Sequence, residues 1–241
     1  MFYSYNGVSV YYKLKREGRG EMNVFLHGWQ RSGKDFEELI KSHGIEDYLL
    51  IDFPPFGGSG QIIDWNMFTY VNMLISLIDY LKIERFNLIG HSFGGRVAII
   101  LSSLKREKVN KLVLIGSAGM KPKWSLKRAL KVQEFKIKRR LGLDVSKFGS
   151  RDYLALSQEM REVFKTVVST YLEDYAKQIE CQTLIIYGEK DLETPVYMAR
   201  RLKRLIKNSR LEIIKGAGHF CFIDSKIQVG KMINKFLWEE K

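Results

Sequence analysis

The chain has 241 residues, of which 45% are hydrophobic and 28% are charged. This composition is that of a globular protein with a sizeable core, and it excludes a disordered chain. The net charge of +13 is compatible with anionic partners or with a merely solvated basic surface, whereas a membrane-spanning helix is excluded because no apolar run of about 18 residues occurs.

The apolar pattern predicts an N-terminal hairpin followed by buried strands. Asn6-Gly7 lies between alternating aromatic and β-branched residues, which is typical of a tight hairpin whose two turn positions need positive φ. Short, continuously apolar runs come next, and such runs are typical of strands buried on both faces of a parallel sheet. They cover residues 23–26, 49–51, 86–89, 112–115, 183–187 and 211–214.

Helical periodicity fills most of the gaps between these strands. We predict helices that begin after the capping residues Ser32, Asp64, Thr194 and Asp224, and one over residues 94–104. Alternating strands and helices imply an α/β fold, with a mostly parallel central sheet and helices on both of its faces.

One long segment interrupts this alternation. Residues 120–180 have helical periodicity but no predicted strand. We therefore expect a helical lid insertion over 120–180, and a core built from residues 1–119 and 181–241.

A nucleophile motif stands between a predicted strand and a predicted helix. Gly90-His91-Ser92-Phe93-Gly94 matches G-x-S-x-G, and that context predicts a strained turn that lifts the serine hydroxyl above the sheet. The flanking glycines fit because the backbone approaches itself closely there. Ser92 is therefore the candidate nucleophile, and the chain contains neither a dinucleotide-binding nor a Walker fingerprint.

A serine nucleophile needs a base, and the chain has four histidines. His43 is near the end of a polar helix, His91 belongs to the elbow itself, and His27 is assigned to a loop. His219 follows the last predicted strand, where a loop can carry the imidazole over the elbow. His219 is the candidate general base.

The histidine in turn needs a carboxylate on its other ring nitrogen. Asp191 follows the preceding strand, so the chain order is serine, acid, histidine, as in α/β-hydrolases. Glu189 and Glu193 are rival acids in the same loop. We expect Asp191 to orient His219.

Acyl transfer also needs two N–H donors for the developing oxyanion. The backbone N–H of Phe93, directly after the serine, is one candidate. The other is the backbone N–H of Trp29, which follows His27-Gly28 after a predicted strand. The alternative is that Trp29 is only a core residue, and both roles are compatible.

Taken together, these motifs resemble the α/β-hydrolase superfamily, and specifically its serine hydrolases of the carboxylesterase kind. The resemblance runs in order through HGW at 27–29, DFPPFGGS at 52–59, GHSFGG at 90–95, YGEKD at 187–191 and GAGHF at 216–220. Pro54-Pro55-Phe56 departs from the more usual Pro-Gly-Phe, which we interpret as turn variation. Serine in the elbow argues against the dehalogenases and epoxide hydrolases of the superfamily, which carry aspartate there.

Basic residues gather at the start of the predicted lid. Residues 121–151 contain eleven Lys or Arg against two acids. A similar HGW occurs in the family member that cleaves pimeloyl-carrier-protein methyl ester, which resembles this chain and docks its acidic partner through basic lid residues. An acidic acyl carrier protein is therefore one candidate partner, and a solvated helical face is the alternative. We predict no nucleic-acid partner because aromatic residues are not interleaved with the basic run for stacking.

Two cysteines, Cys181 and Cys221, do not make a disulfide framework. We expect reduced thiols, a cytoplasmic location and no signal peptide.

The function that these residues predict is hydrolysis of small carboxylic esters through an acyl-enzyme, with no metal or organic cofactor. Thioester hydrolysis, cleavage of C–C bonds in dienoic keto acids, and ligand binding without turnover are the alternatives.

Overall fold

The structure is a computed structural model that describes residues 1–241 apart from 19, 124–125, 145–150, 155 and 239–241. At its centre is an eight-stranded sheet with the strand order β1-β2-β4-β3-β5-β6-β7-β8. The pairs β1–β2 and β2–β4 are antiparallel, and every other neighbouring pair is parallel. The strands are β1 (Phe2–Tyr5), β2 (Val8–Lys15), β3 (Met22–Leu26), β4 (Tyr48–Ile51), β5 (Phe86–His91), β6 (Val109–Ile115), β7 (Gln182–Gly188) and β8 (Ser209–Ile214).

The N-terminal hairpin has the predicted turn. Asn6 and Gly7 have φ values of 48° and 80°, and Tyr5 pairs with Val8 across the turn. Positive φ at both positions matches the right-handed twist of the two strands, which is why Asn-Gly is favoured there.

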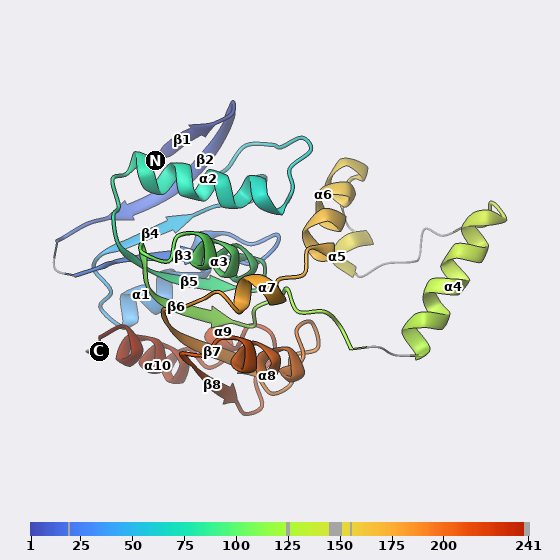
Figure 1. Ribbon diagram of the computed structural model, residues 1–241. Coiled ribbons are helices and arrows are strands. Elements are labelled where there is room, and N and C mark those ends of the chain that lie inside the picture. Colours follow the sequence, from blue (N-terminus) through green and yellow to red (C-terminus); the bar gives the residue numbers. More distant parts are fainter. Residues whose placement is uncertain (19, 124–125, 145–150, 155, 239–241) are drawn as a thin grey trace.

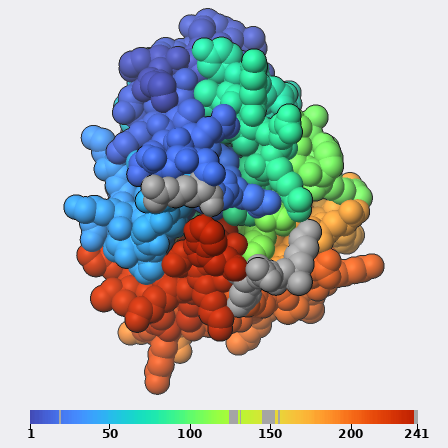
Figure 2. All heavy atoms as spheres, turned by 90° about the vertical axis from the view of Figure 1, so that its left-hand side faces the viewer, coloured from blue at the N-terminus to red at the C-terminus, as the bar shows by residue number. Residues whose placement is uncertain are grey.

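Helices cover both faces of the sheet, as predicted (Figure 1). Side chains alternate along each strand, so Val24 and Leu26 pack on one face and Phe25 on the other. The first face is covered by α2 (Met67–Tyr80), α3 (Phe93–Leu104) and α8 (Val196–Leu205), and the second by η1 (Gly33–Phe36), α1 (Glu37–Ser42), α9 (Cys221–Asp224) and α10 (Lys226–Trp238). Figure 2 views the molecule from the left-hand side of Figure 1, and in this view the N-terminal residues lie above the C-terminal ones.

Three predicted helix starts differ from the structure. Asp224, the predicted cap of the last helix, is itself the last residue of α9, and α10 begins at Lys226. Helix α2 begins at Met67 and is capped by Asn66, whose side chain accepts from the N–H groups of Phe68 and Thr69. Asp64, the predicted cap, has a φ of 54° and therefore lies outside the helical path. Helix α8 begins at Val196 without a side-chain cap, because the Thr194 hydroxyl is bonded elsewhere, as described below.

The segment between β6 and β7 holds α4 (Leu126–Arg140), α5 (Arg151–Leu154), α6 (Gln158–Ser169) and α7 (Glu173–Ala176), with no strand among its described residues. In Figure 1, α4 lies away from the rest of the chain, and its Leu130 and Ile137 are exposed. No described helix is both long enough and apolar enough to cross a membrane.

Candidate active site

Ser92 lies at the sharp turn between β5 and α3. Its φ of 50° and ψ of −108° are strained for a residue with a side chain. A Cβ added at Gly90 would lie 2.6 Å from the carbonyl oxygen of Gly94, and one added at Gly94 would lie 2.1 Å from that of Leu26. Both glycines are therefore sterically required, which is the reason for the G-x-S-x-G spacing.

The loop after β3 is fastened to this turn. His27 is fully buried, and its Nδ1 lies 2.7 Å from the Gly28 carbonyl while its Nε2 accepts from the Phe53 N–H at 2.8 Å. The Gly94 N–H donates to the His27 carbonyl at 3.0 Å. His27 therefore has the structural loop role assigned to it from sequence.

The two predicted oxyanion donors lie close to this hydrogen bond along the chain. Phe93 precedes Gly94, and Trp29 is two residues after His27. Within the described part of the chain, neither the Trp29 nor the Phe93 backbone N–H has a hydrogen-bond acceptor. The first N–H groups of a helix have no intrahelical partner, so the Phe93 N–H is available, and the helix dipole adds partial positive charge near it. Both residues line the same cavity as Ser92.

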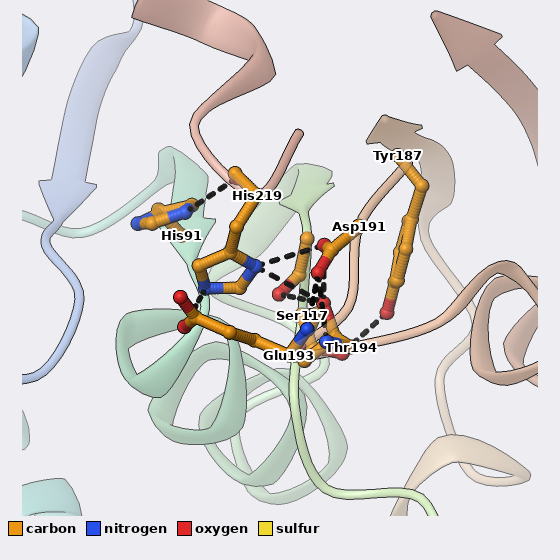
Figure 3. A network of polar contacts seen from close by, with 8 residues as sticks. His91, Ser117, Tyr187, Asp191, Glu193, Thr194 and His219 are labelled. Atoms are coloured by element: carbon orange, nitrogen blue, oxygen red, sulfur yellow. Dashed lines mark hydrogen bonds and ion pairs between the residues drawn. The ribbon is translucent and has the colours of Figure 1, made fainter. Parts of the chain in front are cut away.

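The structure brings Asp191 and His219 together, as Figure 3 shows. The Oδ2 atom of Asp191 lies 2.8 Å from Nδ1 of His219, and both residues are buried. Asp191 lies just past β7 and His219 just past β8, so the parallel strands bring the two loops to the same edge of the sheet. This contact can orient the imidazole and stabilise its protonated form.

Thr194 completes the surroundings of Asp191, a role that its sequence position did not indicate. Its hydroxyl donates to Asp191 Oδ2 at 2.7 Å, and the N–H groups of Glu193 and Thr194 donate to Oδ1 at 2.9 and 2.8 Å. Burial raises the pKa of Asp191, but the hydrogen bonds from His219 and Thr194 outweigh it and lower the pKa overall. Asp191 is thus held ionised beside the imidazole.

The other ring nitrogen of His219 faces a second carboxylate. Glu193 Oε2 lies 3.3 Å from His219 Nε2, and the Glu193 side chain is 58% exposed (Figure 3). No hydrogen bond joins Ser92 Oγ to His219 among the described residues. Both side chains nevertheless line one cavity of about 450 Å³, and a rotation of the exposed Glu193 side chain would free Nε2. Glu193, considered from sequence only as a rival for the role of Asp191, lies on the opposite side of the ring.

His91 lies beside His219 without replacing it. Its Nε2 is 3.1 Å from the backbone carbonyl of His219, and the two ring centroids are 4.8 Å apart. Burial, followed by the proximity of His219, lowers the pKa of His91 to about 3. The ring is therefore neutral at ordinary pH and can donate Nε2–H to that carbonyl.

The remaining candidates lie away from the imidazole of His219. Glu189 accepts the Gly216 N–H at 2.9 Å. His43 lies at the C-terminal end of α1, with its ring against Gly230 of α10. Cys221 is buried in the core, and burial raises the pKa of its thiol to about 12, which fits a small apolar filler rather than a nucleophile.

Most of the basic residues at 121–151 lie on or near α4. Lys138, Arg139 and Arg140 form its last turn. Within the predicted lid, residues 124–125, 145–150 and 155 lie outside the described residues, and they include the basic residue Lys147.

The family model for the α/β hydrolase fold matches residues 24–169, more than half of the chain. The chain belongs to the α/β-hydrolase family. The match includes the Ser92 turn and the loop that carries Trp29, and the strand order and the site at the carboxyl ends of the strands agree with it.

Known relatives of this hydrolase are enzymes. It is 25% identical to 2-hydroxy-6-oxononadienedioate/2-hydroxy-6-oxononatrienedioate hydrolase 1 of Pseudomonas putida, with 95% of this chain and 92% of the relative covered. Among solved structures, the enol-lactonase from Burkholderia xenovorans LB400 superposes with a TM-score of 0.77 at 20% identity, covering 99% of this chain and 100% of the other. The esterase EaEST from Exiguobacterium antarcticum gives a TM-score of 0.74 at 21% identity, with 96% of both chains covered. This protein is accordingly a hydrolase of the α/β fold.

Proposed function

We propose that this hydrolase cleaves carboxylic esters through an acyl-enzyme, with Ser92 as nucleophile, His219 as general base and Asp191 as the orienting acid. The observation that carries the proposal is the Asp191–His219 contact of 2.8 Å beside a cavity that Ser92 also lines. A solvated loop carboxylate would have no reason to be buried against an imidazole.

The first half of the reaction forms the acyl-enzyme. Nε2 of His219 exchanges Glu193 for the Ser92 hydroxyl and takes its proton as Oγ attacks the ester carbonyl carbon. The backbone N–H groups of Trp29 and Phe93 bind the oxyanion. The tetrahedral intermediate collapses when His219 gives the proton to the leaving alkoxide.

The second half returns the enzyme to its starting state. His219 takes a proton from a water molecule that attacks the acyl carbon. A second oxyanion forms in the same place, and its collapse releases the acid and returns the proton to Ser92 Oγ. Asp191 stays ionised throughout, which agrees with the direction of its pKa.

The test uses p-nitrophenyl butyrate and a fluorophosphonate probe. Wild type is expected to hydrolyse the ester and to be labelled at Ser92, and Ser92→Ala is expected to lose both properties. Ser102→Ala is the matched control, because Ser102 is a buried serine of α3, the helix that follows Ser92, and does not line the cavity. Hydrolysis by wild type at the buffer rate would favour a ligand-binding protein instead.

A second candidate reaction is cleavage of a C–C bond in a dienoic keto acid. The observation in its favour is the Pseudomonas putida relative, whose name gives 2-hydroxy-6-oxo dienedioate substrates. The same serine and histidine would serve, with a carbanion equivalent as the leaving group. Turnover of such a keto acid at a higher kcat/KM than any simple ester would favour this candidate.

We also propose a binding partner for this hydrolase, an acidic acyl carrier protein. Its support is the exposed Lys136, Arg139 and Arg140 on α4. Salt-sensitive binding of carrier protein that weakens when residues 138–140 are changed to Ala is the expected result, and unchanged affinity would contradict it. Cys181 and Cys221 do not make a disulfide framework, and we place the enzyme in the reducing cytoplasm.

A further inference from the structure

Some charged side chains of the catalytic cavity have a partner of opposite charge, and one does not. Arg31 donates to Asp35 through Nε and Nη2, both at 2.7 Å, so its charge is neutralised locally. Glu193 contacts His219. Arg96 of α3, the remaining charged residue of the lining, has no carboxylate partner among the described residues.

Arg96 is a buried cation. Only 8% of Arg96 is exposed to solvent. Burial lowers the pKa of its guanidinium to about 10, so the group remains protonated at neutral pH. A buried charge without a counter-ion is destabilising. Such an arrangement is expected where a ligand supplies the missing charge.

The hydrogen bonds of Arg96 leave donor capacity. Nη1 donates to the carbonyls of Val167 and Thr170, each at 2.9 Å, at the C-terminal end of α6. Nη2 has only one contact, 3.5 Å from the Val168 carbonyl, which is at the outer limit for a hydrogen bond. A guanidinium carries five N–H donors, so Arg96 can hold α6 and still bind an anion.

The position of Arg96 relative to Ser92 sets the kind of anion. The backbone N–H of Arg96 donates to the Ser92 carbonyl at 3.3 Å, so Arg96 follows the nucleophile by one turn of α3, and both residues line the same cavity. Phe164 and Val167 of α6 line the same cavity and are apolar. A substrate with its scissile carbonyl at Ser92 and an anionic group at Arg96 would place an apolar chain along these side chains.

We propose that Arg96 is a specificity-determining residue that binds a carboxylate at the far end of the acyl group, so that the preferred substrates are half-esters of short dicarboxylic acids. This inference rests on the proposed ester hydrolysis. Planar guanidinium and carboxylate groups match in shape and charge. Glu193 beside His219 would repel the same carboxylate, which fixes the direction in which the substrate enters.

The experiment compares two p-nitrophenyl esters of equal shape, the glutarate half-ester and the neutral 5-methylhexanoate. Wild type is expected to prefer the glutarate ester by about tenfold or more in kcat/KM, and Arg96→Gln to abolish that preference. The readout is the ratio of the two kcat/KM values, which a general loss of lid packing would not change. Succinate and adipate half-esters then measure the distance from Ser92 to the anion site.

Arg161 provides the matched control. It belongs to α6 and, like Arg96, donates to backbone carbonyls, those of Tyr153 and Leu154, but it does not line the catalytic cavity. Arg161→Gln is expected to keep the wild-type ratio. Arg96→Lys, which keeps the charge, is expected to keep part of it.

The outcomes separate this inference from the proposed function. A wild-type ratio near one, or a preference that survives in Arg96→Gln, would show that Arg96 only fastens α6. Failure of wild type to hydrolyse either ester would contradict the proposed function itself. If Arg96→Gln does not fold, the wild-type ratio and the Arg96→Lys ratio decide the question.

Discussion

Glu193 places its Oε2 atom 3.3 Å from Nε2 of His219, the nitrogen that must accept the Ser92 proton during catalysis. His219 is therefore held between two carboxylates of one loop, Asp191 on Nδ1 and Glu193 on Nε2 (Figure 3). The two carboxylates differ in burial, because Asp191 is enclosed whereas the Glu193 side chain is 58% exposed. The exposed one can move away when substrate enters.

Removal of the Glu193 carboxylate should raise activity on neutral esters. A polar contact to a side chain as exposed as that of Glu193 contributes about 1 kcal/mol or less, so Glu193→Gln is expected to raise kcat/KM by about twofold to fivefold. Steady-state kinetics with p-nitrophenyl butyrate measure the effect. Glu180→Gln, which removes another exposed carboxylate, paired with Arg106, should leave kcat/KM unchanged. A decrease in Glu193→Gln would mean that Glu193 assists the reaction.

Replacement of the orienting acid should have a much larger effect. Asp191→Asn is expected to lower kcat by about a thousandfold or more, because the amide neither stabilises the imidazolium nor maintains the tautomer of His219. Glu189→Gln is the control, since the Glu189 carboxylate accepts from the Gly216 N–H, away from the His219 imidazole. Similar losses of kcat in both variants would contradict the proposed role of Asp191 as the orienting acid.

Thr194 should act as a positioning residue. Thr194→Val removes the hydroxyl bond to Asp191 Oδ2 but keeps the shape of the side chain, and kcat is expected to fall by about tenfold. KM should change little, because valine keeps the shape that Thr194 presents to the cavity. Thr194→Ser restores the hydroxyl and should recover most of the activity. No recovery in the serine variant would indicate a packing role instead.

Stability should decrease as the pH falls below about 6.5, the pKa of an unperturbed histidine. Burial lowers the pKa of His91 to about 3 and also lowers that of His27. Below pH 6.5 the unfolded chain therefore binds protons that the folded chain does not, and the contribution of His91 is fully present only above that pH. The loss from His91 between pH 7 and pH 5 is about 2 kcal/mol.

Urea unfolding at pH 7 and pH 5 measures this dependence. His91→Gln keeps an N–H donor for the His219 carbonyl and removes the titrating ring, so the difference between the two pH values should shrink. His43→Gln, which changes a half-buried histidine on α1, should retain the wild-type difference. Equal pH dependence in wild type and His91→Gln would contradict the assignment.

Features that depend on a few neighbouring residues could be predicted from the sequence. The Asn6-Gly7 turn requires positive φ, and the elbow requires glycine at positions 90 and 94 because backbone atoms would meet any Cβ there. Both requirements are local and steric. Residues that follow different strands can meet because parallel strands end at one edge of the sheet, which alternation of strands and helices already implies. The chain order of serine, acid and histidine is what the resemblance to α/β-hydrolases implies.

The starts of helices were less predictable, because several polar residues can compete for one cap. Asp64 and Asn66 lie two residues apart, and the choice between them depends on the path of the chain before α2. Thr194 looked like a cap next to Pro195, but its hydroxyl bonds to Asp191. Only the folded loop shows which acceptor lies nearest.

Local patterns in the sequence predict the strand and helix alternation and the strained turn at Ser92, because apolar periodicity and backbone sterics act over a few residues. The places of His219 and Asp191 after predicted strands select them as candidates, with Glu189 and Glu193 as rival acids. The tertiary structure alone decided that Glu193 contacts His219, that Thr194 bonds to Asp191, and that Arg96 is a buried cation in the cavity wall. These contacts join residues that are brought together only by the fold. The strength of a charge interaction depends on the burial of the two groups and on the distance between them.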